Sequence, residues 1–152
     1  MRFRVKKVIL LIILILLVGC SKKDRVYLDD EFYGQSKFIK ISEEKIEELK
    51  DIKSTYVLYT YNNFCTMPIP CEDVFEEFMD KNNISFYSIP FSKFKNTYLH
   101  DTIKFAPTIA IIKNGKILIY LDANSNKDYD YYQDVNKFTN WMTNQIYLEA
   151  QS

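Results

Sequence analysis

The chain has 152 residues, a length suited to one domain of ordinary size, and its 20 basic and 20 acidic residues give a formal net charge of zero. Four of the basic residues and none of the acidic ones fall within residues 1–19, so the remainder carries 16 basic against 20 acidic residues. This balance excludes a basic nucleic-acid-binding face. Only 3 residues are glycine and 16% are aromatic, which favours a well-filled core.

The N-terminus has the pattern of an export signal. Residues 1–7 are basic, and residues 8–18 form an unbroken apolar run that is too short to span a hydrocarbon core of about 30 Å. The run ends in Leu17-Val18-Gly19-Cys20, which resembles a bacterial lipobox. The resemblance implies that Cys20 is acylated and becomes the new N-terminus; the alternative is an uncleaved anchor in which Cys20 has no role.

These features divide the chain into three parts. We expect residues 1–19 to be a lipoprotein signal peptide, residues 20–36 a lipid-anchored tether with a short ordered stretch near Val26, and residues 37–152 the domain. Two or more acyl chains on Cys20 suffice for stable anchoring. The domain is therefore expected at the bacterial cell membrane, on its extracytoplasmic side.

The first half of the domain shows strand and helix patterns in turn. Residues 37–41 alternate polar and apolar side chains, which predicts a half-exposed strand. Ser42 is a good N-cap for a helix with Glu43 and Glu44 in its first turn. The buried stripe of this helix is predicted to consist of Ile46, Leu49 and Ile52. Residues 56–61 are suited to a central strand.

A second helix is predicted after Pro70, which fits the first helical position because its missing N–H costs nothing there. Its packed face is predicted to consist of Val74, Phe75, Phe78 and Met79. Residues 84–89 predict a further strand, and residues 91–103 a short, irregular helical segment.

The last third begins with a hairpin. Asn114-Gly115 is a strong turn signal between two strands predicted at residues 108–113 and 116–122. A polar loop follows at residues 122–130. The final amphipathic helix is predicted over residues 133–149, with an inward face of Val135, Phe138, Trp141, Met142 and Ile146.

The predicted order of elements is β-α-β-α-β-α-β-β-α, which indicates an α/β fold with a central mixed sheet covered by helices on both faces. Over residues 37–148 the chain resembles the thioredoxin family, and two segments carry the resemblance: residues 55–65 and residues 105–116, which contain Ala106-Pro107 and a Lys-Asn-Gly turn. The resemblance implies a thioredoxin-like fold in which Ala106 and Pro107 form a cis-proline loop that binds the backbone of a substrate peptide. A trans proline at the start of a strand is the alternative.

The resemblance also assigns a role to the cysteines. Cys65 stands where the family has its first, nucleophilic cysteine, but Pro68 occupies the position of the second, and the next cysteine is Cys71. Because Met67 and Ile69 each precede a proline, the helix should not begin before about Pro70. Cys71 would then lie in the first helical turn, where the helix dipole favours the thiolate. The cysteine roles are therefore expected to be exchanged, with Cys71 attacking and Cys65 resolving.

Two further departures concern the chemistry of this site. Tyr59 stands where the family has a buried carboxylate, and Phe64 stands where it has tryptophan. The leading hypothesis is a thiol–disulfide oxidoreductase that acts on protein or peptide disulfides through Cys65 and Cys71, without a cofactor. The alternatives are a static disulfide or two unpaired thiols, in a redox-inactive lipoprotein that binds a peptide or an envelope protein.

Other signals are weaker. Residues 122–130 place oxygen ligands at alternate positions, but Lys127 and Gln133 stand where a calcium loop needs glycine and glutamate, so a solvated loop is expected. His100 is the only histidine, and two thiols without histidine make a poor zinc site, so no metal is expected. Tyr129, Tyr131 and Tyr132 are expected to pack between the loop and the last helix. The sequence does not specify an oligomeric state.

Overall fold

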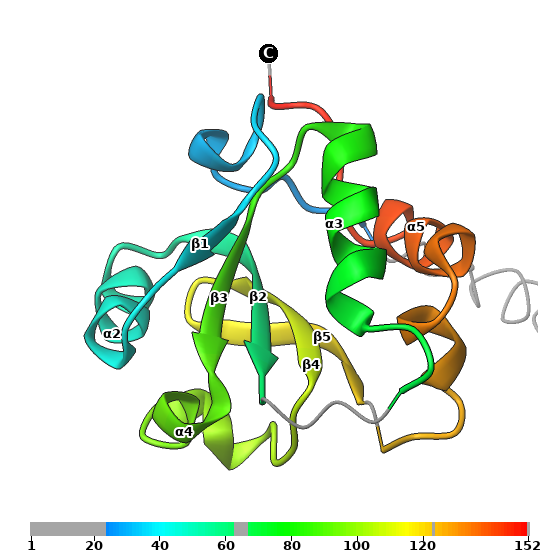
Figure 1. The fold of residues 1–152 in the computed structure, drawn as a ribbon. Helices are drawn as coiled ribbons and strands as arrows, with labels where there is room; N and C mark the ends of the chain where they lie inside the picture. The colour runs from blue at the N-terminus through cyan, green and yellow to red at the C-terminus, as the bar shows by residue number, and fades with distance from the viewer. Residues whose placement is uncertain (1–23, 63–66, 123, 152) are drawn as a thin grey trace, which may run out of the picture.

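The structure is a computed structural model of the chain and describes residues 24–62, 67–122 and 124–151. Its centre is a five-stranded sheet with the order β1-β3-β2-β4-β5 (Figure 1). The strands are β1 (Phe38–Lys40), β2 (Thr55–Tyr61), β3 (Phe86–Pro90), β4 (Thr108–Lys113) and β5 (Lys116–Asp122). Neighbouring strands among β1, β3 and β2 are parallel, whereas β4 pairs antiparallel with both β2 and β5. The predicted α/β fold with a mixed sheet is confirmed.

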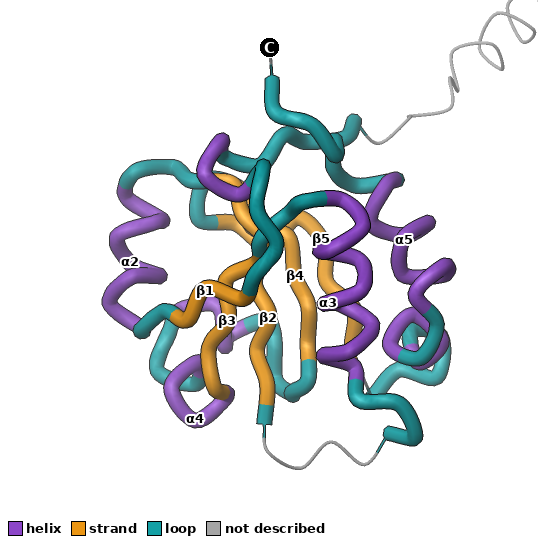
Figure 2. The backbone as a smooth tube through the Cα atoms, turned by 45° about the horizontal axis from the view of Figure 1, so that its top comes forward, coloured by secondary structure: helices purple, strands orange, loops and turns teal. Residues whose placement is uncertain are grey.

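Helices cover both faces of the sheet. Helices α3 and α5 lie on one side, and α2 and α4 lie on the other (Figures 1 and 2). The α-helices are α2 (Glu43–Asp51), α3 (Cys71–Asn82), α4 (Phe91–Phe94) and α5 (Val135–Thr143). The short 3-10 helices in the described part of the chain are η1 (Asp30–Phe32), η2 (Tyr98–Asp101) and η3 (Tyr129–Tyr132). The hairpin strands have the predicted limits, with Asn114 and Gly115 at the turn.

The core between the sheet and helices α3 and α5 is largely aromatic. Phe78 of α3 contacts Phe86 of β3 and Phe138 of α5, with ring centroids 5.9 and 5.3 Å apart. All three side chains are completely buried. The predicted packed face of α3 is confirmed, since each of its four members is buried. This cluster fixes α3, and therefore its N-terminus, against the sheet.

Three local predictions were wrong in detail. Ile52 was predicted to be buried, but α2 ends at Asp51, so Ile52 lies in the turn and is 62% exposed. Pro70 is the N-cap of α3 rather than its first helical residue. The last helix ends at Thr143; Ile146 lies beyond it but is still buried, and it forms an isolated β-bridge with Val26.

Residues 24–36, which the sequence assigned to a tether, pack against the domain. Leu28 and Phe32 are buried, at 3% and 0% exposure. The segment pairs with two distant parts of the chain, through Val26 with Ile146 and through Tyr33 with Ile84. The ordered stretch expected near Val26 therefore extends through this whole segment.

Asp29 joins this segment to the sheet, and its replacement tests how much the segment contributes. Its carboxylate accepts hydrogen bonds from the Ser54 hydroxyl and, at 3.0 Å, from the backbone N–H of Thr55. Both donors belong to buried residues, so Asp29→Ala should lower the free energy of unfolding by about 1–3 kcal/mol in denaturant titrations. The matched control is Asp30→Ala, whose exposed side chain should contribute little. Equal stability of the two variants would contradict a structural role for this segment.

Among the described residues, no helix is long and apolar enough to cross a membrane. The predicted signal peptide and Cys20 lie outside the described part of the chain.

Candidate redox site

The candidate site lies where three elements meet, at the end of β2, the start of β4 and the N-terminus of α3 (Figure 1). Cys71 is the first residue of α3, as the two upstream prolines predicted, and Glu72 and Asp73 follow it in the first turn. Its side chain is only 1% exposed. Cys65 and Phe64 lie outside the described residues. The described half of the predicted cysteine pair is thus a buried thiol at a helix N-terminus.

Tyr59 is a polar neighbour of this thiol. Its hydroxyl lies 3.4 Å from Sγ of Cys71, at a separation and angle that allow either atom to donate. The ring is held by the aromatic side chains of Phe38 and Phe75, with centroid distances of 5.3 and 5.2 Å, and is 4% exposed. Where the thioredoxin pattern has a carboxylate, this site therefore has a tyrosine hydroxyl in contact with sulfur.

The peptide bond between Ala106 and Pro107 is cis, as predicted. The loop around it is held by side chains on both sides. Nδ2 of Asn62, just beyond β2, donates to the Ala106 carbonyl at 3.0 Å, and the Thr108 hydroxyl donates to the Phe105 carbonyl at 2.8 Å. These contacts position the cis-proline loop against the end of β2.

Tyr132 of η3 lies beside this loop. Its completely buried hydroxyl donates to the Leu121 carbonyl at 2.6 Å and lies 3.4 Å from the carbonyl oxygen of Pro107. Burial raises the pKa of Tyr132 well above its usual range, and the nearby Cys71 acts in the same direction. The ring of Phe75 contacts the rings of both Tyr59 and Tyr132, with centroids 5.2 and 5.7 Å apart, so the surroundings of Cys71 and of the cis-proline loop are continuous.

The raised pKa of Tyr132 predicts a loss of stability in alkali. An unfolded tyrosine ionises near pH 10, whereas the buried one keeps its proton, so its contribution is complete below about pH 10 and declines above that value. Tyr132 should therefore lower the free energy of unfolding by about 1.4 kcal/mol for each pH unit above pH 10. Denaturant titrations from pH 8 to 11.5 should show a shallower decline for Tyr132→Phe than for the wild type. The exposed control, Tyr129→Phe, should keep the wild-type slope.

Gln133 holds the segment that precedes α3. Its Oε1 accepts from the backbone N–H of Ile69 at 3.0 Å, and its Nε2 donates to the Ile69 carbonyl at 2.8 Å. The same amide lies 3.4 Å from Sδ of Met67. Neither Gln133 nor Asn62 belongs to a recognisable motif, so their roles at this site could not be predicted from the sequence.

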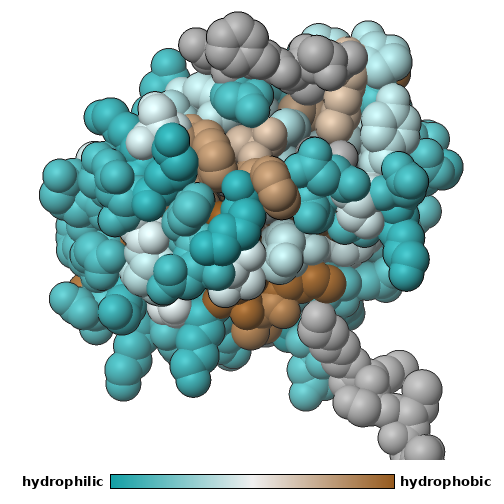
Figure 3. All heavy atoms as spheres, turned by 90° about the horizontal axis from the view of Figure 1, so that it is seen from below, coloured by the Kyte–Doolittle hydropathy of each residue, from teal (hydrophilic) through white to brown (hydrophobic). Residues whose placement is uncertain are grey.

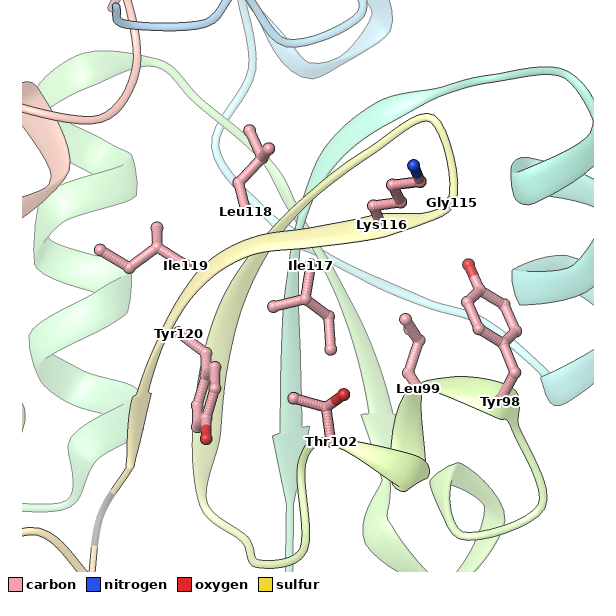
Figure 4. A pocket seen from close by; sticks show the side chains of 9 residues that line it. All are labelled: Tyr98, Leu99, Thr102, Gly115, Lys116, Ile117, Leu118, Ile119 and Tyr120. Atoms are coloured by element: carbon pink, nitrogen blue, oxygen red, sulfur yellow. The ribbon is translucent and has the colours of Figure 1, made fainter. Parts of the chain in front are cut away.

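Apolar side chains surround the site on the surface. Phe105 and Ile69 are 54% and 44% exposed, and apolar patches interrupt the hydrophilic surface at this end of the molecule (Figure 3). A hollow of about 150 Å³ beside Phe105 includes Thr102 and Tyr120 in its wall. Both residues also line a larger groove of about 450 Å³ under β5, into which Ile117 and Tyr120 point (Figure 4).

The remaining candidates do not contribute to this site. His100 packs against the rings of Phe91 and Phe94. In the polar loop, the carboxylate of Asp128 accepts a hydrogen bond from the Asp122 backbone N–H at 3.0 Å. This oxygen atom therefore stabilises the loop itself. No group of metal-binding side chains was found among residues 24–62, 67–122 and 124–151.

The contact between Tyr59 and Cys71 predicts an effect on reactivity. A hydroxyl that donates to sulfur favours the thiolate, and such a bond contributes about 0.5–1.5 kcal/mol. Tyr59→Phe removes only the hydroxyl, so alkylation of Cys71 at pH 7 should slow by about 2- to 10-fold. Intact mass spectrometry of a Cys65→Ser background would follow Cys71. Tyr61→Phe is the matched control, and an equal effect in both variants would contradict the role of Tyr59.

No protein-family model matches this sequence, and no curated protein matches it. Solved structures do resemble the chain. Thioredoxin O1 of Arabidopsis thaliana in the oxidised state is 19% identical, with a TM-score of 0.51 over 74% of this chain and 100% of that one. Schistosoma mansoni thioredoxin is 21% identical, with a TM-score of 0.50 over 72% of this chain and 97% of that one. The protein therefore has a thioredoxin-like fold.

Proposed function

We propose that the protein is a membrane-anchored thiol–disulfide oxidoreductase that acts on protein disulfides outside the cytoplasm. The observation that carries the proposal is the environment of Cys71. This thiol lies at a helix N-terminus in contact with the Tyr59 hydroxyl, and the rings of Phe75 and Tyr132 connect Tyr59 to the loop with the cis peptide bond before Pro107. The second thiol, Cys65, stands six positions earlier in the sequence.

The burial of Cys71 assigns the roles of the two cysteines in this proposal. A cysteine residue that is 1% exposed offers almost no surface to a disulfide on another protein, so Cys71 acts as the resolving thiol. The first attack then falls to Cys65. The proposed order is thus the reverse of the exchange of roles expected from the position of the helix alone.

Each step of the proposed reaction balances. The Cys65 thiolate attacks one sulfur of the substrate disulfide, which forms a mixed disulfide and releases the other substrate sulfur as a thiolate. The Cys71 thiolate then attacks Sγ of Cys65, closes a Cys65–Cys71 disulfide and releases the second substrate thiolate. Two electrons pass from the cysteine pair to the substrate, and the two protons of the pair end on the substrate thiols. The reverse sequence oxidises a substrate dithiol.

The surroundings of the site support a peptide substrate. The cis-proline loop lies at the start of β4, and the exposed side chains of Phe105 and Ile69 provide apolar contact area near it. A substrate strand bound along the loop would bring its disulfide to Cys65. Lipid on Cys20 would keep the enzyme at the extracytoplasmic surface of the membrane.

The same exposed residues also favour a second candidate, a redox-inactive module that binds a peptide. A redox titration of the full chain in detergent separates the two, with thiols counted by alkylation and intact mass. Exchange predicts a two-electron transition between about −120 and −270 mV. A disulfide that remains oxidised below about −300 mV, or thiols that never pair, would overturn the redox proposal and support the binding module.

A further inference from the structure

We infer that a patch beside the N-terminal end of the described chain rests on the surface of an anionic bilayer, with the redox site facing away from it. The N-terminal patch consists of Arg25, Tyr27, Lys113, Leu118 and Tyr147. The inference rests on the lipid anchor of the proposed function. It goes further by specifying which side of the domain meets the membrane and which class of substrate can reach Cys65 and Cys71.

The length of the link determines which residues are near the membrane. Residues 24–36 pack against the domain, so only residues 21–23 separate Cys20 from the folded part. Four Cα steps span at most about 14 Å when the chain is fully extended. Because the acyl chains on Cys20 would be inserted in the bilayer, the surface next to Asp24 must lie close to the headgroups.

The patch has the side chains that such a position favours. The rings of Tyr27 and Tyr147 stack with centroids 4.1 Å apart, and the guanidinium of Arg25 lies 4.3 Å from the centroid of Tyr147. Tyrosine is enriched at membrane interfaces because its ring is apolar and its hydroxyl is polar. Tyr27 is 38% exposed, so part of this stack is available to lipid.

The hairpin supplies the rest of the patch. Arg25 and Val26 line a hollow of about 220 Å³ together with Lys113 and Leu118. Leu118 is 41% exposed and lies on the opposite side of β5 from Ile117 and Tyr120 (Figure 4). An exposed leucine flanked by two cations can enter the headgroup layer while the cations bind lipid phosphates.

The charge on the described surface is unevenly distributed. Arg25 and Lys113 line the hollow together with one acidic residue, Asp24. Helix α3 instead exposes five carboxylates, those of Glu72, Asp73, Glu76, Glu77 and Asp80, against one cation, Lys81, which pairs with Glu77. Burial is the main cause that raises the pKa of Glu76, and repulsion by neighbouring carboxylates of the helix raises it further. An anionic membrane would attract the patch and repel α3, so the two surfaces favour the same orientation.

This orientation keeps the site away from the bilayer. Lys113 lies at the end of β4 that pairs with Thr55, whereas Thr108 pairs with Thr60 at the site end. The six residue steps from Lys113 to Pro107 span about 20 Å. The substrates would therefore be water-soluble proteins or domains that project from the membrane, rather than cysteines within it.

Tryptophan quenching tests the orientation. The full lipidated chain carries either Leu118→Trp in the patch or Phe105→Trp at the site, and is reconstituted in phosphatidylglycerol vesicles with brominated acyl chains. Trp141 is present in both variants, and the wild type gives its background. The added tryptophan at position 118 should lose most of its fluorescence, and the one at position 105 almost none. Equal quenching at both positions, or stronger quenching at 105, would overturn the inference.

The contribution of positive charge to membrane binding is tested with a matched pair of substitutions. In chains that carry Leu118→Trp, Arg25→Glu should reduce the quenching in phosphatidylglycerol vesicles, whereas Lys104→Glu, an exposed lysine beside Phe105, should not. An equal effect of both substitutions would contradict binding through the patch. Protection of position 118 that rises with protein concentration would assign the patch to a second copy of the chain and overturn the inference.

Two controls separate this inference from the redox proposal. Intact mass of the vesicle-bound protein shows whether Cys20 carries lipid, and its absence would overturn both the anchor and the inference. Disulfide exchange is measured in the same vesicles. Loss of exchange together with the expected quenching pattern would overturn the redox proposal alone.

Discussion

Replacement of Cys71 by serine is expected to abolish complete disulfide exchange and to trap the substrate on Cys65 as a mixed disulfide. Without the resolving thiol, the first step still occurs but the second cannot. The substitution should leave the fold intact, since the serine hydroxyl is close in size to the thiol and keeps Tyr59 as a hydrogen-bond partner. Non-reducing electrophoresis and intact mass after incubation with a disulfide substrate would detect the trapped complex.

Cys65→Ser is the matched control and should form no complex at all, because the buried Cys71 thiol cannot reach the substrate. The opposite result, in which Cys65→Ser accumulates the mixed disulfide and Cys71→Ser does not, would restore the exchanged roles expected from the sequence. Full exchange activity in both variants would show that neither cysteine takes part.

Elements with a regular apolar pattern could be predicted from the sequence. The packed face of α3 and the hairpin around Asn114-Gly115 are examples, because local spacing and turn chemistry determine both. The structure of residues 24–36 could not be predicted, because it depends on pairing with residues far along the chain, such as the bridge between Val26 and Ile146. Ile52 shows the same limit, since a shift in the end of one helix exposed a residue predicted to be buried.

The candidate site was also only partly predictable from the sequence. Cys71 at the helix N-terminus and the cis bond before Pro107 followed from the prolines and from the resemblance to thioredoxins. The burial of Cys71 and the contacts of Tyr132 and Gln133 could not be predicted. They depend on how η3 and the start of α5 pack against the cis-proline loop and the segment before α3. The sequence therefore indicated which thiols could react, whereas packing was needed to assign their order.

The largest stability effect is expected at Phe78, which joins α3 to both the sheet and α5. The side chain is completely buried between Phe86 and Phe138, so Phe78→Ala leaves a cavity that the rigid aromatic neighbours cannot fill. Such substitutions cost about 3–5 kcal/mol, a large share of the roughly 5–15 kcal/mol that stabilises a typical domain. Urea titration should show a lower midpoint with an unchanged slope if unfolding remains two-state.

Ile52→Ala is the surface control for this substitution, and its 62% exposure predicts a change within about 0.5 kcal/mol. A loss below about 1 kcal/mol for Phe78→Ala would mean that the aromatic core tolerates the cavity, contrary to its packing. Phe78 lies two helical turns from Cys71, about 10 Å along the axis. The redox potential of the fraction that stays folded should therefore remain close to that of the wild type, since the contact of Cys71 with Tyr59 is unaffected.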